Sequence, residues 1–132
     1  MKRFFVDTSA WFAYVNAGDP DHGSVQEVLD GFRGRIVTSN SVFDETITLC
    51  AHRLGHRVAV DVGQVLLDPG VVDLIHVTLI DEQKAWALFV DRSDKDYSFT
   101  DCTSFALMRR MGIQTAVSLD ADFRREGFDL LP

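Results

Sequence analysis

Asp7 is the first residue along the chain that could do chemistry, because its carboxylate directly follows the apolar run at positions 4–6. A short apolar run of this kind is typical of a parallel strand that is covered on both faces. A carboxylate at the end of such a strand is costly to desolvate unless it has a partner. We therefore expect a cation or a hydrogen-bond donor beside Asp7.

Three more acidic residues occupy comparable positions. Asp120 follows an apolar segment in "AVSLDADF", Asp101 lies at the start of a predicted helix in "SFTDCTSF", and Glu45 lies early in the helix after the second predicted strand. In an open parallel sheet, ligands bind outside the carboxyl ends of the strands, where loops and helix N-termini meet. We therefore expect these three acids to converge with Asp7 at one edge of the sheet.

Each of these acids also has a purely structural interpretation. Asp101 fits the favourable interaction of a carboxylate with a helix N-terminus, Glu45 fits a solvated helix position, and Asp120 fits a turn. The choice between neighbouring acids is open as well. Asp44 adjoins Glu45, and Asp122 could share or take the role of Asp120.

Converging carboxylates repel one another, and a divalent cation would compensate that repulsion. Oxygen ligands favour Mg²⁺ or Mn²⁺, and no pair of His or Cys has the spacing of a zinc site. The chemistry that uses such a site is metal-assisted phosphodiester hydrolysis. Thr8, Ser9 and Thr100 could orient the acids or an attacking water, although helix capping would explain the same hydroxyls. Asp96 is a candidate for a further, peripheral acid.

Other phosphate chemistries do not match the sequence. The chain has neither the Gly-Lys signature of a P-loop nor a GxGxxG motif. Phosphatases with an aspartyl nucleophile after the first strand use a D-x-D pattern, but position 9 is Ser. Nucleotide hydrolysis by these routes is therefore disfavoured.

Alternating strands and helices must position these acids. Apolar runs predict strands at 4–6, 35–39, 71–77, 114–118 and 128–132. Helical periodicity predicts helices at 8–18, 22–32, 41–54, 57–67, 81–90 and 100–111. Asn40 or Ser41 could cap the third helix, Ala85, Leu88 and Phe89 should face inward, and Gly112 should end the last helix. This alternation predicts an α/β fold, a three-layer α/β/α sandwich on a mostly parallel sheet of four or five strands.

Composition sets further bounds. A chain of 132 residues fits one domain, and its net charge of −7 argues against a broad positive surface for nucleic acid, although acids gathered at a cation site would explain part of it. No apolar stretch approaches the roughly 20 residues that cross a bilayer, and the N-terminus lacks a secretory signal pattern, so we expect a cytoplasmic protein without a membrane partner. Cys50 and Cys102 are expected to be buried free thiols.

Four segments in order, "FFVDTSAW", "SNSVFDETITL", "YSFTDCTSFALMRRMGI" and "AVSLDADFRREGFDLLP", resemble the motifs of the PIN-domain ribonucleases. More narrowly, they resemble the VapC toxins of type II toxin–antitoxin systems. The resemblance covers positions 4–131 and implies a single PIN domain at 1–132. It implies that the motif acids correspond to Asp7, Glu45, Asp101 and Asp120, with Asp7 and Asp101 as the most consistent metal-binding pair.

The resemblance also implies an activity and partners. The activity would be Mg²⁺-dependent (or Mn²⁺-dependent) cleavage of RNA, such as tRNA or ribosomal RNA, and hence inhibition of translation. The partners would be a second copy of the chain in a homodimer and an antitoxin whose peptide covers the acidic groove. A cationic side chain of that peptide would compensate the same carboxylates as the metal does.

Basic residues at the rim of the groove are candidates for RNA contacts: Arg53, Arg57, Arg109 and Arg124. Solvated helix faces would explain the same residues. The aromatic residues at 11, 12 and 14 could stack on RNA. A helix rich in aromatics is more typical of a core or a dimer contact, and we favour such a contact over stacking on RNA.

Two alternative functions remain open. The first is a PIN-like module that binds a protein or RNA without cutting, although the complete set of acidic motifs argues against it. The second is a PIN nuclease of RNA processing or DNA cleavage outside any toxin system, which fits the same acids equally well.

Overall fold

The computed structural model describes residues 2–132 as a five-stranded parallel sheet with helices on both sides. The strands are β1 (Arg3–Val6), β2 (Arg35–Ser39), β3 (Val72–Ile75), β4 (Thr115–Val117) and β5 (Asp129–Leu131). The helices are α1 (Thr8–Val15), α2 (His22–Gly31), α3 (Asn40–Leu54), α4 (His56–Leu66), α5 (Leu79–Asp91), α6 (Phe99–Met111) and α7 (Asp122–Arg125).

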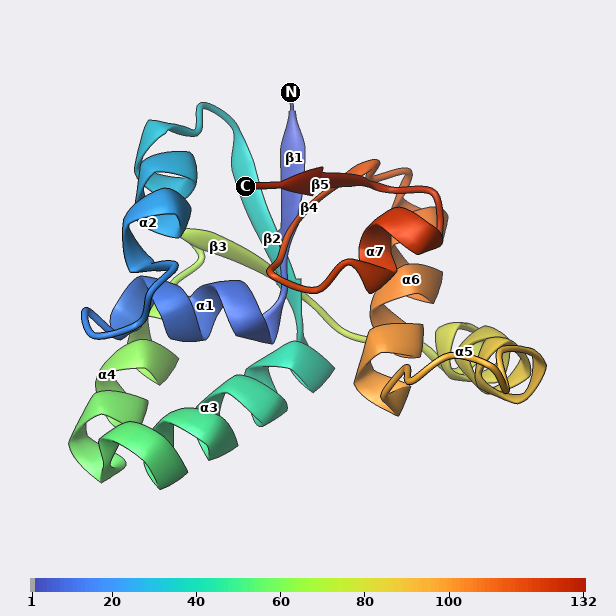
Figure 1. Ribbon diagram of the computed structural model, residues 1–132, viewed down its shortest axis with the longest axis horizontal. Helices are drawn as coiled ribbons and strands as arrows, with labels where there is room; N and C mark the ends of the chain where they lie inside the picture. Colours follow the sequence, from blue (N-terminus) through green and yellow to red (C-terminus); the bar gives the residue numbers. More distant parts are fainter. Residues whose placement is uncertain (1) are drawn as a thin grey trace.

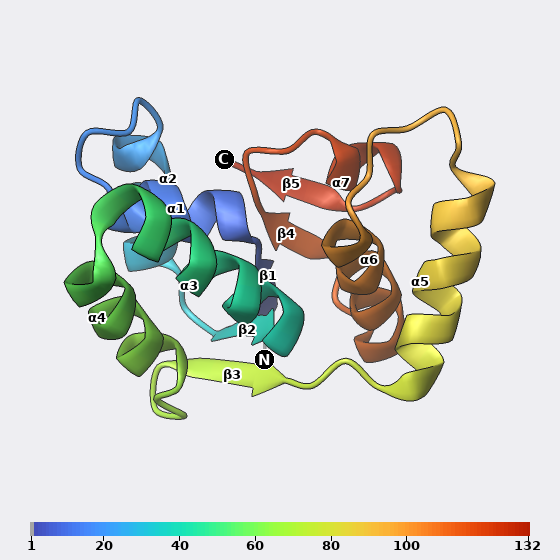
Figure 2. The ribbon, with the colours of Figure 1, turned by 90° about the horizontal axis from the view of Figure 1, so that it is seen from below.

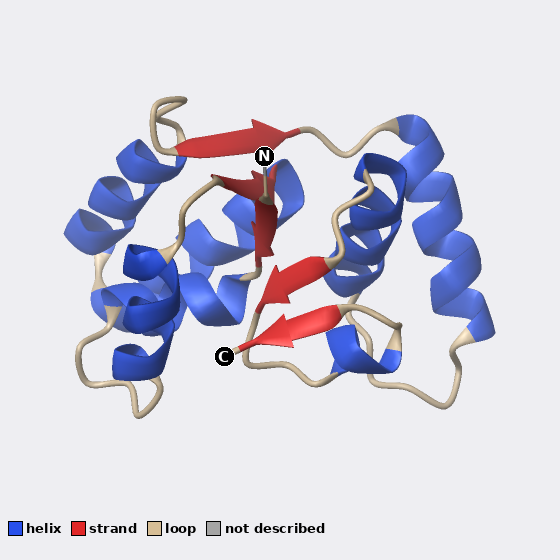
Figure 3. Ribbon diagram, turned by 90° about the horizontal axis from the view of Figure 1, so that it is seen from above, coloured by secondary structure: helices blue, strands red, loops and turns tan. Residues whose placement is uncertain are grey.

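The order of the strands explains how the helices are distributed. The sheet runs β3-β2-β1-β4-β5, so the chain builds outward from β1 in one direction and then returns to add β4 and β5 on the other side. Figure 1 shows α1 to α4 on one side of the sheet and α5 to α7 on the other, and Figure 3 shows the strands passing between these two groups of helices. The α/β/α sandwich is confirmed, and its sheet is entirely parallel.

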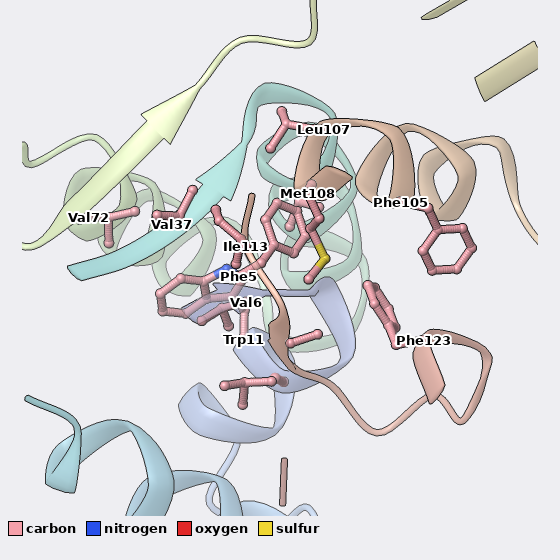
Figure 4. Packing of buried hydrophobic residues seen from close by; sticks show 14 of the residues in the cluster. Phe5, Val6, Trp11, Val37, Val72, Phe105, Leu107, Met108, Ile113 and Phe123 are labelled. Atoms are coloured by element: carbon pink, nitrogen blue, oxygen red, sulfur yellow. The ribbon is translucent and has the colours of Figure 1, made fainter. Parts of the chain in front are cut away.

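The central strand β1 is buried on both faces. Phe5 and Val6 have no exposed surface, and they pair with Val37 of β2 or with Ala116 and Val117 of β4. On the side of α5 to α7, aromatic rings fill the space between helices. Figure 4 shows the rings of α6 and α7 facing each other, with 5.0 Å between the centroids of Phe105 and Phe123. This packing holds the carboxyl end of β1 in a rigid frame.

The carboxyl ends of β1 and β4 form the point at which the winding of the sheet changes direction. In such sheets this crevice is the common ligand site. The N-terminus of α3 also approaches α6 here, so helices from the two sides of the sheet meet beside the strand ends (Figure 2). The elements that carry the four predicted acids therefore come together.

Several predicted boundaries were displaced. The first helix ends at Val15 rather than near residue 18. Neither Asn40 nor Ser41 caps α3, because Ser39 keeps an extended backbone and its side chain accepts a hydrogen bond from the Val42 N–H at 3.0 Å. The third strand spans only Val72–Ile75, since the chain leaves the sheet before the start of α5.

Two predictions about the second half of the chain were wrong or incomplete. Ala85 is buried and Leu88 is half-buried, but Phe89 is 42% exposed, because it lies about 100° around the helix from Leu88. Helix α7 was not predicted, since four residues are too few to show helical periodicity.

Other local predictions were confirmed. Gly112 ends α6 with φ of +67°, a left-handed conformation that favours glycine. Cys50 and Cys102 are buried free thiols. Within residues 2–132, no helix is both long and apolar enough to cross a membrane.

Candidate functional site

Asp7 follows β1 directly and is only 4% exposed. Its Oδ2 atom accepts hydrogen bonds from Ser118 Oγ at 3.0 Å and from Ser9 Oγ at 3.2 Å. Its Oδ1 atom is buried and has no hydrogen-bond partner among the described residues. Burial, followed by the charge of Asp101, raises the pKa of Asp7 from 3.8 to about 7. A buried carboxylate oxygen without a donor is the feature that a bound cation would satisfy.

Ser118 is a site residue that the sequence reasoning missed. It follows β4 as Asp7 follows β1, and its Oγ atom accepts a hydrogen bond from the Asp120 N–H at 3.0 Å. Ser9 Oγ lies 3.1 Å from Ser118 Oγ and accepts from the Leu119 N–H at 3.0 Å. The two hydroxyls therefore join the ends of β1 and β4 and orient Asp7. The sequence signal that could have identified Ser118 is its place as a polar residue directly after an apolar strand.

Asp101 lies in the first turn of α6 and is half-buried. The backbone N–H of Ser98 donates to Asp101 Oδ2 at 2.9 Å, and the Asp101 N–H donates to Ser98 Oγ at 3.0 Å, which forms a capping box. Burial and the charge of Asp120 raise the pKa of Asp101 to about 6, although the hydrogen bonds from Ser98 oppose them. The other oxygen of Asp101 is left for a ligand.

Asp120 and Asp122 lie after β4, and together with Asp101 they form a group whose ligand oxygens are all within 4.8 Å of one another. The Asp122 N–H donates to Asp120 Oδ1 at 2.9 Å, which holds the turn into α7. Asp122 is 8% exposed and pairs with Arg125, and burial and Asp120 raise its pKa. Both acids therefore belong to this group, and Asp122 already forms an ion pair with the guanidinium of Arg125.

Glu45 lies half-buried in α3, whereas its neighbour Asp44 is exposed. Glu45 and Thr100 line an open pocket of about 480 Å³ on the surface. The charge of Glu45 contributes to the raised pKa values of both Asp7 and Asp101, so Glu45 faces the same crevice. The position of Glu45 relative to the other acids agrees with the sequence expectation.

Thr8 and Thr100 make structural hydrogen bonds, Thr8 through its hydroxyl and Thr100 through its backbone carbonyl. Thr8 is buried and accepts a hydrogen bond from Thr46 Oγ1 at 3.3 Å, which ties α1 to α3. The Thr100 carbonyl accepts hydrogen bonds from Thr103 Oγ1 and Ser104 Oγ at 2.7 and 3.1 Å. Of the three predicted hydroxyl residues, Ser9 is the one whose side chain donates to a site carboxylate.

The candidate metal ligands fit a hard divalent cation. All candidate ligands are carboxylate oxygens, which Mg²⁺ and Mn²⁺ prefer. The buried Oδ1 of Asp7 has no donor, and the pKa values of Asp7 and Asp101 are raised by burial and by neighbouring acids. A bound cation would remove both unfavourable features.

The structure distributes the other predicted residues around the surface. Asp96 is exposed in the loop before α6, where it lines a pocket with Trp86 and Lys95. Arg109 donates to the carboxylate of Glu126 at 3.0 Å, but the Arg109 side chain is 46% exposed, so it forms an internal ion pair and still reaches the surface. The other three candidates for RNA contacts lie on exposed positions of α3, α4 and α7: Arg53, Arg57 and Arg124. Arg57 pairs with Asp61 at 3.6 Å.

The aromatic residues of α1 are mostly internal. Trp11 is 4% exposed, and its indole N–H donates to Thr38 Oγ1 at 3.4 Å. Phe12 and Tyr14 are half-buried and pack against the core. Core packing therefore explains these three residues.

Comparisons with known proteins converge on one family. The model of the PIN domain family matches residues 4–128. The chain is 45% identical over 124 residues to the 23S rRNA-specific endonuclease VapC20 of Mycobacterium tuberculosis, which covers 94% of each chain. It is 29% identical over 115 residues to Ribonuclease VapC26 of the same species, covering 87% of this chain and 84% of that one.

Solved structures agree with this result. The crystal structure of M. tuberculosis VapC20, described as a sarcin-ricin loop cleaving toxin, matches with a TM-score of 0.92 and 43% identity over 98% of this chain and 99% of the other. DNA-bound VapBC from Salmonella typhimurium matches with a TM-score of 0.74 and 12% identity, covering 98% and 97% of the two chains. At that identity the second match concerns the fold alone.

Proposed function

The chain belongs to the PIN-domain family, and we propose that it is a Mg²⁺-dependent endoribonuclease that acts as the toxin of a type II toxin–antitoxin pair. One observation carries the proposal: the buried, unpartnered Oδ1 of Asp7 belongs to a carboxylate whose pKa is raised by burial and by the charge of Asp101, a member of a group of three acids. The name of the relative VapC20, an endonuclease specific for 23S rRNA, supports RNA as the substrate.

We assign the metal ligands to Asp7 and Asp101, with Asp120 and Glu45 completing the acidic site. Ser9 and Ser118 hold Asp7 in orientation through its Oδ2 atom, which leaves the Oδ1 atom as the one that would bind a cation. A bound divalent cation supplies Lewis-acid stabilisation to a phosphodiester that is attacked by water.

Ribosomal RNA is the substrate that we propose, because the relative that shares 45% identity over 94% of the chain is specific for 23S rRNA. The net charge of −7 is compatible with this substrate if cations neutralise the acidic crevice. Arg53 and Arg124, which are exposed, are the candidates for phosphate contacts at the rim.

An antitoxin is the proposed inhibitor. The unpartnered Asp7 Oδ1 and the carboxylates around it would accept hydrogen bonds from an arginine or lysine side chain as readily as they would bind a metal. An antitoxin peptide with such a residue would occupy the crevice and exclude the cation.

A homodimer is the proposed assembly, and the exposed face of α5 supports it. An apolar stripe on α5 comprises Leu79, Trp86 and Val90, which are 70, 60 and 58% exposed. An exposed apolar patch of this length marks an interaction surface. If two copies of α5 pack antiparallel about a two-fold axis between positions 83 and 86, Leu79 lies opposite Val90 of the second copy. The stripe is therefore self-complementary, as an isologous interface requires.

The test is cleavage of a 23S rRNA fragment by the purified protein with Mg²⁺. We expect Asp7→Asn to lower the cleavage rate at least 100-fold while circular dichroism shows an intact fold, and we expect EDTA to abolish cleavage. Glu27→Gln, which changes an exposed acid on α2, is the matched control and should cleave normally. Cleavage that persists in EDTA would contradict the metal mechanism.

Expression without an antitoxin tests the toxin role. The wild-type chain should arrest growth, and Asp7→Asn should not. A harmless wild-type chain that binds RNA without cutting it would favour the interaction module instead. Cleavage of other RNA or DNA without growth arrest would favour a processing nuclease.

A further inference from the structure

Glu126, the residue after α7, has a carboxylate that is 3% exposed and accepts hydrogen bonds from three side chains. Its Oε2 atom accepts from Tyr97 Oη at 2.8 Å and from Arg92 Nε at 3.0 Å. Its Oε1 atom accepts from Arg109 Nη2 at 3.0 Å and from Arg92 Nη2 at 3.4 Å. Burial alone would raise the pKa of Glu126, but these donors outweigh it and lower the pKa to about 2. The carboxylate is therefore ionised and fully paired.

The three donors come from different parts of the chain. Arg92 follows α5, Tyr97 lies in the loop between α5 and α6, and Arg109 lies near the end of α6. Arg109 also donates to the backbone carbonyl of Glu126 at 2.8 Å. Tyr97 is 6% exposed, and its ring packs edge-on against Phe105 with 5.1 Å between centroids. We call these four residues, Arg92, Tyr97, Arg109 and Glu126, the Glu126 clamp.

Both ends of the Glu126 clamp adjoin acids of the metal group. Tyr97 precedes Ser98, whose N–H donates to Asp101 Oδ2 at 2.9 Å. On the other side, the Glu126 N–H donates to the Asp122 carbonyl at 3.1 Å. A continuous path of contacts therefore joins Asp101 on α6 to the acids that follow β4, and this path does not pass through the sheet.

The acids on the two sides of this path repel each other. The carboxylate oxygens of Asp101, Asp120 and Asp122 lie within 4.8 Å of one another, and without a cation their repulsion favours a wider separation. The Glu126 clamp opposes that separation, because moving α7 away from α6 would break hydrogen bonds to a buried carboxylate.

We propose that Glu126 and Tyr97 are positioning residues that set the separation between Asp101 and the pair Asp120 and Asp122, and thereby the affinity for a divalent cation. The proposal rests on the proposed function only in taking Asp101 and Asp120 as ligands of the cation. It makes Arg109, a candidate for RNA contacts from sequence, a part of the scaffold.

The test is isothermal titration of the full-length protein with Mn²⁺. Tyr97→Phe removes one donor and keeps the ring that packs on Phe105, so the fold should survive, and the affinity should fall about 10-fold, as is typical when a partner outside the ligand shell is lost. Tyr14→Phe is the matched control, because Tyr14 Oη donates to Asp30 Oδ1 at 2.6 Å between α1 and α2, away from α6. Its affinity should not change.

A second pair of variants separates positioning from stability. Glu126→Gln should weaken Mn²⁺ binding more than Tyr97→Phe does. Asp81→Asn is its control. Asp81 on α5 is 1% exposed, and it forms an ion pair with Arg110 on α6 at 2.8 Å, so this pair also links the two helices. Both variants should lower the melting temperature, but only Glu126→Gln should lose affinity. If Glu126→Gln does not fold, Tyr97→Phe decides the question.

The outcomes distinguish the two proposals. If Asp101→Asn abolishes Mn²⁺ binding while Tyr97→Phe binds like the wild type, the positioning role is wrong and the metal site stands. If Tyr14→Phe and Asp81→Asn lose as much affinity as the clamp variants, the effect is general destabilisation and the positioning role is again wrong. A wild-type protein that binds no Mn²⁺ would overturn the metal site and the positioning role together.

Discussion

Two buried carboxylates of this protein have opposite properties, and the difference lies in their partners. Glu126 has two guanidinium partners and a pKa of about 2. Asp7 has neutral donors and acidic neighbours but no guanidinium partner, and burial raises its pKa to about 7. The first carboxylate is stabilised by its surroundings, whereas the second is destabilised in its charged form. A carboxylate that a fold keeps in an unfavourable environment is a candidate for cation binding.

This environment predicts how stability depends on pH in the absence of metal. The pKa of Asp7 rises from 3.8 to about 7 on folding, and that of Asp101 rises to about 6. Protonated forms are therefore favoured by the fold, so their contribution is present at low pH and is lost as the pH rises through 6 and 7. In EDTA, we expect the free energy of unfolding to fall by about 2–4 kcal/mol between pH 5 and pH 8.

Denaturant titration at several pH values measures this slope. Asp7→Asn should flatten it, whereas Asp44→Asn, at an exposed position, should keep it. Carboxylates with guanidinium partners titrate below this window and do not obscure the result. A stability that is constant or rises from pH 5 to pH 8 in EDTA would contradict the raised pKa of Asp7.

At the scale of elements, the same capping motif serves two purposes. Thr78 and Asp81 form a capping box at the start of α5, and Ser98 and Asp101 form one at the start of α6. In α5 the carboxylate of the box binds Arg110, whereas in α6 it faces other acids. The box of α6 therefore starts a helix and also positions a candidate metal ligand.

Removing each cap separates these purposes. Thr78→Ala and Ser98→Ala should each lower the free energy of unfolding by about 1 kcal/mol, because each removes one cap hydrogen bond. Only Ser98→Ala should also lower the cleavage rate, since it loosens Asp101. Thermal unfolding and RNA cleavage measure the two effects. Equal losses of cleavage in both variants would mean that stability alone governs the rate.

The sequence predicted those parts of the site that depend on local order along the chain. Asp7 was found because a strand ends there, and Asp101 because a helix starts there. Ser118 was missed, since its role depends on β4 lying beside β1, which brings it within 3.0 Å of Asp7. The ion pair between Arg109 and Glu126 was missed for the same reason, because the two residues are 17 positions apart. Contacts between distant segments leave no periodic signal.

At the scale of the whole molecule, topology and charge act together. The order β3-β2-β1-β4-β5 places the ends of β1 and β4 side by side at the point where the winding reverses, so the acids after both strands share one crevice. The chain carries a net charge of −7, and two copies must therefore repel each other at long range. A homodimer through the apolar stripe of α5 has to overcome that repulsion by burying apolar surface.

The dimer prediction follows from this balance. The wild-type chain should sediment as a dimer, and Trp86→Glu, which places a charge in the middle of the stripe, should sediment as a monomer. Leu67→Glu is the control, because Leu67 is 61% exposed but lies after α4, and this variant should remain dimeric. Higher salt should strengthen the dimer by screening the repulsion, whereas it would weaken RNA binding to the same stripe. A monomeric wild type whose Trp86→Glu variant loses RNA affinity would therefore assign the stripe to RNA.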